Sequence, residues 1–219
     1  DDRLWMLVQD HGPNEGRFIT QRDTGCGKLA LVKAIPNGDG DIYFSTPDGR
    51  KLVVVENDLS CYDSVVQVWG DVCNAKDAGN VAAQWFSEYL MLPCRLVRLP
   101  DGFIRLTDRN YSRPGDNVSF ADGFPLLVTN LASLEKLRNN FPPNVVIGME
   151  RFRPNIVLDG IQPFEEDFIH EIRIADVVLE FAKPCNRCMV TTIDQSEGVS
   201  ISNEPLETLA QIRHGKGGG

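Results

Sequence analysis

Short apolar runs alternate with clusters of turn-forming residues in the first hundred residues. The runs are RLWMLVQ (3–9), RFIT (17–20), LALVKAI (29–35), DIYFST (41–46) and KLVVV (51–55), and the stretches HGPNEG, PNGDGD and TPDG separate them. Short runs of this kind, divided by Gly, Pro, Asn and Asp, are typical of strands joined by turns. The pattern predicts a small antiparallel β unit.

One segment of this first half has a helical period instead. Its apolar positions follow the three-and-four spacing of a helix face, and they are Ala78, Val81, Ala82, Trp85, Phe86, Tyr89 and Leu90. Asp77 can accept a hydrogen bond from the free amides at the start, and Pro93 follows the end. We therefore expect a helix over 78–90, followed by a strand in CRLVRL (94–99).

The second half has a different rhythm after a polar, turn-rich stretch. We expect a first domain over 1–100, a linker over 101–116 and a second domain over 117–219. Leu131, Leu134 and Leu137 share a helical face, and Pro205 is placed for the first turn of a helix in 203–213. Strands are predicted in 155–160, in 171–181 with a two-residue Ala-Asp turn inside this stretch, and in 189–194. The tail HGKGGG has too little apolar character to join a core.

Composition narrows the class of protein. The 31 acidic and 22 basic side chains give a formal charge of −9, which disfavours a general nucleic-acid surface. No stretch approaches the roughly 20 apolar residues of a membrane helix, and DDRLWMLVQD has no features of a targeting segment. Six cysteines are too few for a disulfide scaffold in a chain of 219 residues. We expect a reducing, cytoplasmic compartment, and an anchor upstream of this sequence stays open.

The stretch KPCNRCMVTTID (183–194) holds Cys185 and Cys188 in a CxxC arrangement. A zinc site would need a second pair of Cys or His ligands, and the sequence has neither a second CxxC nor an HxxxH. A redox dithiol should open a helix in a βαβ pattern, whereas this pair lies between two predicted strands. Two alternatives are stronger. Both cysteines could be half-buried residues without a chemical role, or one of them could be a thiolate ligand of a metal that a cofactor holds.

Four motifs occur together in the second half. They are VSFADGFPLLVTNLASLEKL (118–137), RFRPNIVLDG (151–160), the CxxC stretch and NEPLETL (203–209). In this order they resemble the MOSC-domain molybdenum-cofactor proteins, in the subgroup of amidoxime-reducing components and bacterial reductases of N-hydroxylated bases. The first half resembles the small β-barrel domain that precedes the MOSC core. The resemblance implies a mainly β fold with a few short helices (α+β), in which a small N-terminal β-barrel domain precedes a MOSC β-barrel core.

The resemblance also implies a set of site residues for a molybdenum cofactor (molybdopterin with Mo). The metal ligand of the family carries over to Cys188, and the active-site aspartate, which could orient substrate or relay a proton, carries over to Asp122. The cofactor-binding residues carried over are Arg22, Gly123, Phe124, Asn130, Arg153, Asn155, Asn186 and Arg187. Arginine suits a phosphate because its guanidinium donates two parallel hydrogen bonds.

Each assignment has a plainer alternative. Asp122 could form an Asp-Gly turn, and Asn130 could cap the helix that follows it. Arg153 could form a surface salt bridge beside Glu150, and Arg187 could be a solvated loop cation. The large aromatic residues Trp69, Trp85 and Phe152 are expected in the core, without a chemical role.

The resemblance implies an oxidoreductase that reduces small N-hydroxylated compounds such as amidoximes and N-hydroxylated nucleobases. Because the chain lacks flavin and nicotinamide fingerprints, electrons are expected from a separate haem or flavin protein. The alternative function is a non-catalytic MOSC module that binds the cofactor or carries sulfur. The family's PxKS-type start and its closing strands are missing, so we expect either a fragment of a longer protein or a family member that has lost its ends.

Overall fold

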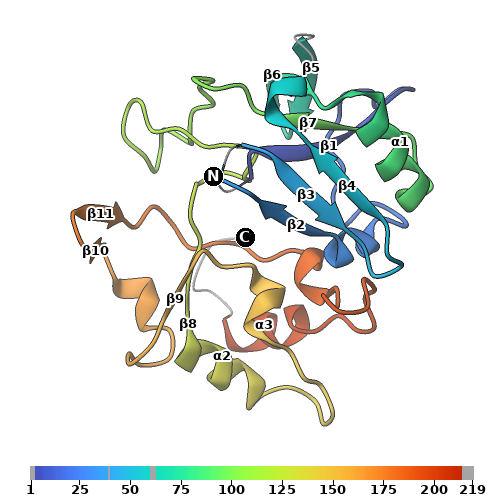
Figure 1. Cartoon of the computed structure of the whole chain (residues 1–219). Helices are drawn as coiled ribbons and strands as arrows, with labels where there is room; N and C mark the ends of the chain where they lie inside the picture. Colours follow the sequence, from blue (N-terminus) through green and yellow to red (C-terminus); the bar gives the residue numbers. More distant parts are fainter. Residues whose placement is uncertain (1–2, 39, 60–62, 214–219) are drawn as a thin grey trace. The chain divides into compact units, whose positions relative to one another are not determined.

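A computed structural model describes residues 3–38, 40–59 and 63–213 (Figure 1). Outside the described residues lie Cys61, one of the six cysteines, and the tail HGKGGG (214–219). The chain divides into two compact units. Unit 1 comprises 1–107, 115–125 and 196–199, and unit 2 comprises 108–114, 126–195 and 200–219. Each unit is assembled from separate stretches of the chain, and the predicted linker contributes to both.

Unit 1 is built on two antiparallel sheets (Figure 1). The four-stranded sheet has the order β1-β7-β6-β5, from β1 (Trp5–Gln9), β7 (Cys94–Arg98), β6 (Asp71–Asp77) and β5 (Asp63–Val68). The three-stranded sheet joins β2 (Lys33–Pro36), β3 (Ile42–Ser45) and β4 (Lys51–Val54). Burial alternates along β3 and β4, so that Phe44 and Leu52 are buried while their neighbours Tyr43 and Val53 are exposed.

The helix predicted in unit 1 is present as α1 (Gly79–Leu90). Its buried face holds Ala82, Ala83, Phe86, Tyr89 and Leu90, as the periodicity predicts. Phe86 packs edge-to-face against Phe44 with ring centroids 5.1 Å apart, which joins the helix to β3. Burial of one such aromatic side chain stabilises the fold by about 2–3 kcal/mol, so this face fixes the helix on the sheet.

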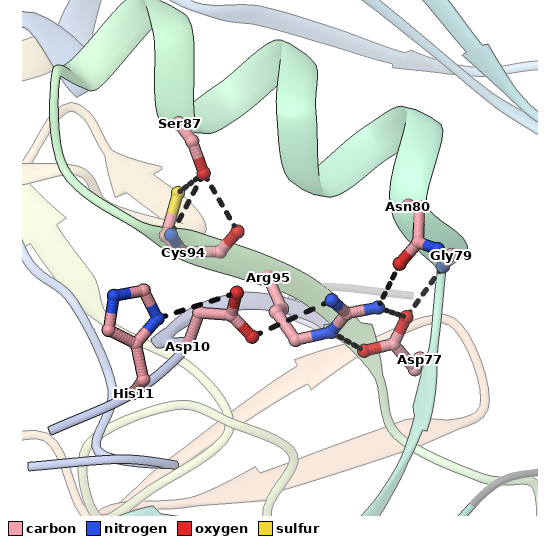
Figure 2. A network of polar contacts seen from close by, with 8 residues as sticks. All are labelled: Asp10, His11, Asp77, Gly79, Asn80, Ser87, Cys94 and Arg95. Carbon is pink, nitrogen blue, oxygen red and sulfur yellow. Dashed lines mark hydrogen bonds and ion pairs between the residues drawn. The ribbon is translucent and has the colours of Figure 1, made fainter.

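Polar contacts fasten both ends of α1 to β7 (Figure 2). At the start, Asp77 accepts a hydrogen bond of 2.6 Å from the Gly79 amide and forms an ion pair of 2.5 Å with the Arg95 guanidinium. In the last turn, the Ser87 hydroxyl donates to the Cys94 carbonyl and accepts from the Cys94 amide. The N-cap position itself belongs to Ala78, but the hydrogen bond expected from Asp77 to a free amide at the helix start is present, and Asp77 also anchors an arginine of the neighbouring strand.

Unit 2 has shorter elements around a smaller core. Strand β8 (Val128–Asn130) pairs in parallel with β9 (Ile156–Leu158), and β10 (Glu171–Ile174) forms a hairpin with β11 (Val177–Glu180) through the predicted Ala-Asp turn. The helices are α2 (Leu131–Arg138), α3 (Leu206–Ile212) and the 3-10 turns η3 (Met149–Phe152), η4 (Glu165–Phe168) and η5 (Met189–Thr192). Its core cluster consists of Leu134, Leu137, Ile147 and Phe152.

Three of the predicted strands differ in the structure. Residues 189–192 form η5, because the Thr191 and Thr192 hydroxyls donate to the carbonyls of Cys188 and Met189 and so favour a helical turn. The first part of 29–35 belongs to the 3-10 turn η1 (Gly27–Leu31), and 17–20 contributes only isolated bridges. A further 3-10 turn is η2 (Glu56–Asp58). The prediction of a mainly β chain with a few short helices is confirmed.

Candidate functional site

In unit 2, Arg187 joins the CxxC loop to the loop that begins with Phe152 and Arg153. Its Nη2 donates a hydrogen bond of 2.7 Å to the Phe152 carbonyl, and its guanidinium carbon lies 5.5 Å from the centre of the Phe152 ring. Phe152 is itself 8% exposed and part of the core cluster. Two motifs separated by about thirty residues are therefore held together through a rigid aromatic side chain.

Arg151 makes a second connection between the same two motifs. It is 5% exposed, and it donates 2.8 Å to the Thr192 carbonyl and 2.7 Å to the Asp194 carboxylate. Just before η5, the Cys188 carbonyl accepts hydrogen bonds from the Thr191 amide at 3.0 Å and the Thr191 hydroxyl at 2.9 Å. The backbone that carries the Cys188 thiol is thus fixed. The sequence analysis missed Arg151, because an arginine in a polar stretch reads as a surface residue.

The two cysteines of the motif differ in their surroundings. Cys185 is exposed and Cys188 is half-buried, and both are free thiols. The Arg187 Nη1 donates to the Cys185 sulfur at 3.1 Å, whereas the Arg187 Nε is buried without a hydrogen-bond partner. The described residues include no group of three or more His, Cys, Asp or Glu that could bind a metal ion. An unsatisfied cationic donor in the same loop as a half-buried thiol suits an anionic cofactor with a soft metal.

Three further predicted residues lie on the surface of unit 2. Arg153 ends η3 in the left-handed conformation, with φ of 53°, and its side chain is exposed. Asn155 is exposed and its Oδ1 accepts a hydrogen bond of 2.9 Å from the Leu127 amide. Asn186 is exposed in the CxxC loop. The cofactor contacts expected of these residues stay predictions.

Asn130 has the structural role that the sequence analysis offered as its alternative. It is 1% exposed, and its Oδ1 accepts from the Ala132 amide at 3.0 Å, which caps α2. Its Nδ2 donates to the Gln162 carbonyl at 2.8 Å and to the Glu166 carboxylate at 3.0 Å. Both donors of the amide are therefore in use, so a cofactor that accepts a hydrogen bond from Asn130 would have to replace one of these bonds.

In unit 1, Arg22 and Asp122 both contact the side chain of Trp69. Its Nε1 donates a hydrogen bond of 3.2 Å to the Asp122 carboxylate, and the Arg22 guanidinium lies 4.5 Å from the ring centroid. Trp69 was expected in the core, and this expectation is wrong because the side chain is 44% exposed at the β5–β6 turn. The expectation holds for Phe152, and Trp85 is packed against the core cluster of α1.

Arg105 holds the backbone that carries Asp122. It is 7% exposed, and its guanidinium donates 2.9 Å, 2.6 Å and 3.1 Å to the carbonyls of Ser119, Ala121 and Asp122. The Asp71 carboxylate pairs with the same guanidinium at 2.7 Å. Gly123 and Phe124 follow as half-buried residues. The segment before Pro125 is therefore fixed by a buried cation, which no pattern in the sequence indicates.

A separate hollow of about 380 Å³ lies in unit 2, between η4 and α3. None of the predicted site residues lines it, and its lining residues are Gln162, Pro163, Phe164, Glu165, Asp167, Phe168, Ile212 and Arg213. Arg213 stacks on Phe164 at 4.7 Å and pairs with Asp167 at 2.7 Å, so the polar groups of the hollow satisfy one another. None of the helices in the described ranges combines the length and the apolar character that a membrane crossing requires.

Comparison with known proteins assigns two segments of the chain to known domain families. Residues 1–93 match the family model of the MOSC N-terminal beta barrel domain, and residues 115–219 match that of the MOSC domain. The chain is similar over 97% of its length to mitochondrial amidoxime-reducing component 1 of Mus musculus (32% identity, 61% of that protein covered). It is also similar to the human components 2 and 1, with 31% and 30% identity over 97% of this chain and 62% of each relative.

The chain thus spans about three fifths of the length of the curated relatives that it matches. Its CxxC, FRPN and NEPLETL motifs all lie within the matched MOSC segment. The family models together account for both halves of the sequence, as the motifs predict. The chain therefore belongs to the MOSC-domain family, with an N-terminal MOSC β-barrel domain followed by a MOSC domain.

Proposed function

We propose that this chain is the cofactor-binding part of a molybdenum-dependent oxidoreductase that reduces N-hydroxylated compounds such as amidoximes and N-hydroxylated nucleobases. The observation that carries the proposal is the connection made by Arg187 between Phe152 and the CxxC loop, in which the buried Arg187 Nε has no hydrogen-bond partner among the described residues and the following residue, Cys188, carries a half-buried thiol. The printed names of the relatives support the reaction, since they are amidoxime-reducing components.

Cys188 is the ligand in this proposal, because a thiolate suits a soft metal and its backbone is fixed by Thr191. When bound, a molybdenum cofactor supplies a centre that exchanges two electrons and an oxygen atom with a substrate. Arg187, Arg153, Asn155 and Asn186 provide the donors for its anionic and amide-like groups. The buried Nε of Arg187 has no acceptor among the described residues, so an anionic oxygen that reached it would not displace an existing hydrogen bond.

Asp122 handles protons in the proposal. Reduction of an N–OH group takes up two electrons and two protons and releases water, so a carboxylate that can bind and release a proton is useful. Asp122 is exposed and held by Trp69, which keeps it accessible and oriented. The electrons come from a separate protein of the haem or flavin type.

The test compares Cys188→Ser with Cys185→Ser in the full-length protein. Cys188→Ser should lose molybdenum and benzamidoxime reduction with a reduced dye by roughly tenfold or more, because serine is a hard ligand that does not replace a thiolate. Cys185→Ser should keep most of both, since serine can still accept from Arg187. Equal retention of metal in both variants would refute the assignment of Cys188. Molybdenum without any turnover in the wild type would favour a cofactor-binding module.

A further inference from the structure

Trp69 occupies a position that neither burial nor turn chemistry explains. It begins the two-residue turn between Val68 of β5 and Asp71 of β6, and its φ is 55°. A bulky side chain is disfavoured in this left-handed region, where glycine is accommodated freely. The indole is also 44% exposed, so it contributes little to the core. Unusual backbone conformations of this kind cluster at functional sites.

The contacts of the indole point to its task. The Nε1 donates 3.2 Å to the Asp122 carboxylate, and the Arg22 guanidinium lies 4.5 Å from the ring centroid. The ring of Phe18 supports the indole, with centroids 5.0 Å apart and planes tilted by 56°. A carboxylate and a guanidinium of opposite charge therefore touch the same aromatic ring.

Arg22 and Asp122 form no ion pair with each other in the described part of the chain. The Arg22 Nε has the Thr20 hydroxyl as an acceptor at 3.4 Å, which leaves the positive charge without a carboxylate. The indole interacts with each group separately, because its face attracts the cation and its N–H binds the anion. Without the ring, the two side chains could approach and neutralise each other.

We propose that Trp69 is a positioning residue, which orients Asp122 and keeps Arg22 available to an anionic group by preventing a direct Arg22–Asp122 pair. This inference rests on the proposed function, in which Asp122 handles protons and Arg22 approaches the cofactor. It extends that function to a residue for which the family motifs gave no role.

The activity test uses two substitutions that divide the contacts of the indole. Trp69→Phe keeps the aromatic face and removes the N–H, and it should lower kcat by roughly tenfold with little change in KM, because one hydrogen bond to a carboxylate is lost. Trp69→Gly removes both contacts and should lower kcat further. Its melting temperature should not fall, since glycine suits the left-handed turn.

Trp85→Phe is the matched control, because the buried Trp85 Nε1 has no hydrogen-bond partner in the described part of the chain. The same change of indole to phenyl should leave kcat unchanged there. A second readout does not depend on turnover. The indole N–H resonance of Trp69, assigned by its disappearance in Trp69→Phe, should shift and exchange faster with solvent in Asp122→Ala. The Trp85 indole resonance should not respond to Asp122→Ala.

The graded loss of kcat with an unchanged melting temperature supports the inference. Wild-type kcat in Trp69→Gly overturns it, and so does a drop in melting temperature that accompanies the loss of activity, because the indole would then be structural. If the wild-type protein has no molybdenum and no turnover, the proposed function fails. In that case the indole N–H resonance of Trp69 is the remaining test of the positioning role. An unchanged Trp69 resonance in Asp122→Ala overturns that role.

Discussion

The described cysteines have two kinds of surroundings. Cys26, Cys73 and Cys94 are at most 2% exposed, and burial raises the pKa of each thiol. Cys94 is the extreme case, because its burial raises the pKa to about 11 against only a partial opposing effect of the Ser87 hydroxyl. Cys185 and Cys188 are accessible by comparison. The thiols suited to chemistry are therefore those of the CxxC motif.

The pKa of Cys94 gives a prediction about stability at alkaline pH. Folding raises the pKa of the Cys94 thiol from 9.0 to about 11. The stabilising contribution of the neutral thiol is therefore complete below pH 9 and is lost as the pH rises toward 11. The free energy of unfolding should fall in this window by about 2 kcal/mol more in the wild type than in Cys94→Ala. Urea denaturation at pH 8 and pH 10.5 measures it. If the free energy of unfolding falls by the same amount in both proteins between these pH values, Cys94 does not contribute to the pH dependence of stability.

The residue roles that sequence reasoning assigned wrongly, as for Trp69, or left open, as for Asn130, have a common physical cause. Trp69 reads as a core residue because tryptophan is usually buried, yet its place at a two-residue turn next to Gly70 was visible between the alternating stretches 63–68 and 71–77. Asn130 lies in a family motif, but the same letter also fits a helix cap, and only the contacts with Gln162 and Glu166 separate the two roles. Residue type alone does not specify the partner of a polar atom.

At the scale of elements, the segment before Asp122 depends on one buried arginine. Arg105→Met keeps the aliphatic stem but removes the donors to three backbone carbonyls, which should destabilise the protein by roughly 2–4 kcal/mol. Arg109→Met is the control, because Arg109 is exposed. The free energy of unfolding of this variant should stay within about 0.5 kcal/mol of the wild-type value. Guanidinium denaturation measures both. Similar curves for the two variants would mean that Arg105 does not fix the segment.

Element prediction succeeded where one periodicity dominates. The face of α1 and the hairpin β10–β11 follow from spacing alone. It failed at 189–194, where a β-branched run favours a strand but the threonine hydroxyls bond to nearby carbonyls and stabilise a 3-10 turn. The strands β5 and β6 were missed although Val66, Val68, Cys73 and Ala75 alternate with polar or exposed neighbours. Periodicity describes burial, and it does not weigh local side-chain hydrogen bonds.

At the scale of the whole molecule, the motifs predicted which loops carry the site but not how they are fastened. The sequence identified Arg187, Cys188 and Arg153 through family resemblance. The structure adds that Arg187 contacts Phe152 and that Arg151 reaches Thr192 and Asp194. These bonds connect segments about forty residues apart, and such long-range pairs have no local signature in one sequence.

The overall charge of −9 gives the last prediction, because an acidic protein repels the anionic cofactor that we propose it binds. Local donors must overcome this repulsion, so the position of a positive charge should matter more than the total. Arg187→Gln and Arg109→Gln change the net charge by the same amount, yet Arg187 meets Phe152 and the CxxC loop while Arg109 is exposed.

Molybdenum per chain after gel filtration should therefore fall strongly in Arg187→Gln and stay near wild type in Arg109→Gln. Melting temperatures of the two variants show whether a loss of metal reflects unfolding. If both variants lose metal equally, the general field of the protein controls retention. In that case the unpaired Nε of Arg187 is not a cofactor contact. If Arg187→Gln alone loses metal while it stays folded, a single guanidinium outweighs the field of the whole acidic molecule, as short-range hydrogen bonds to an anion should.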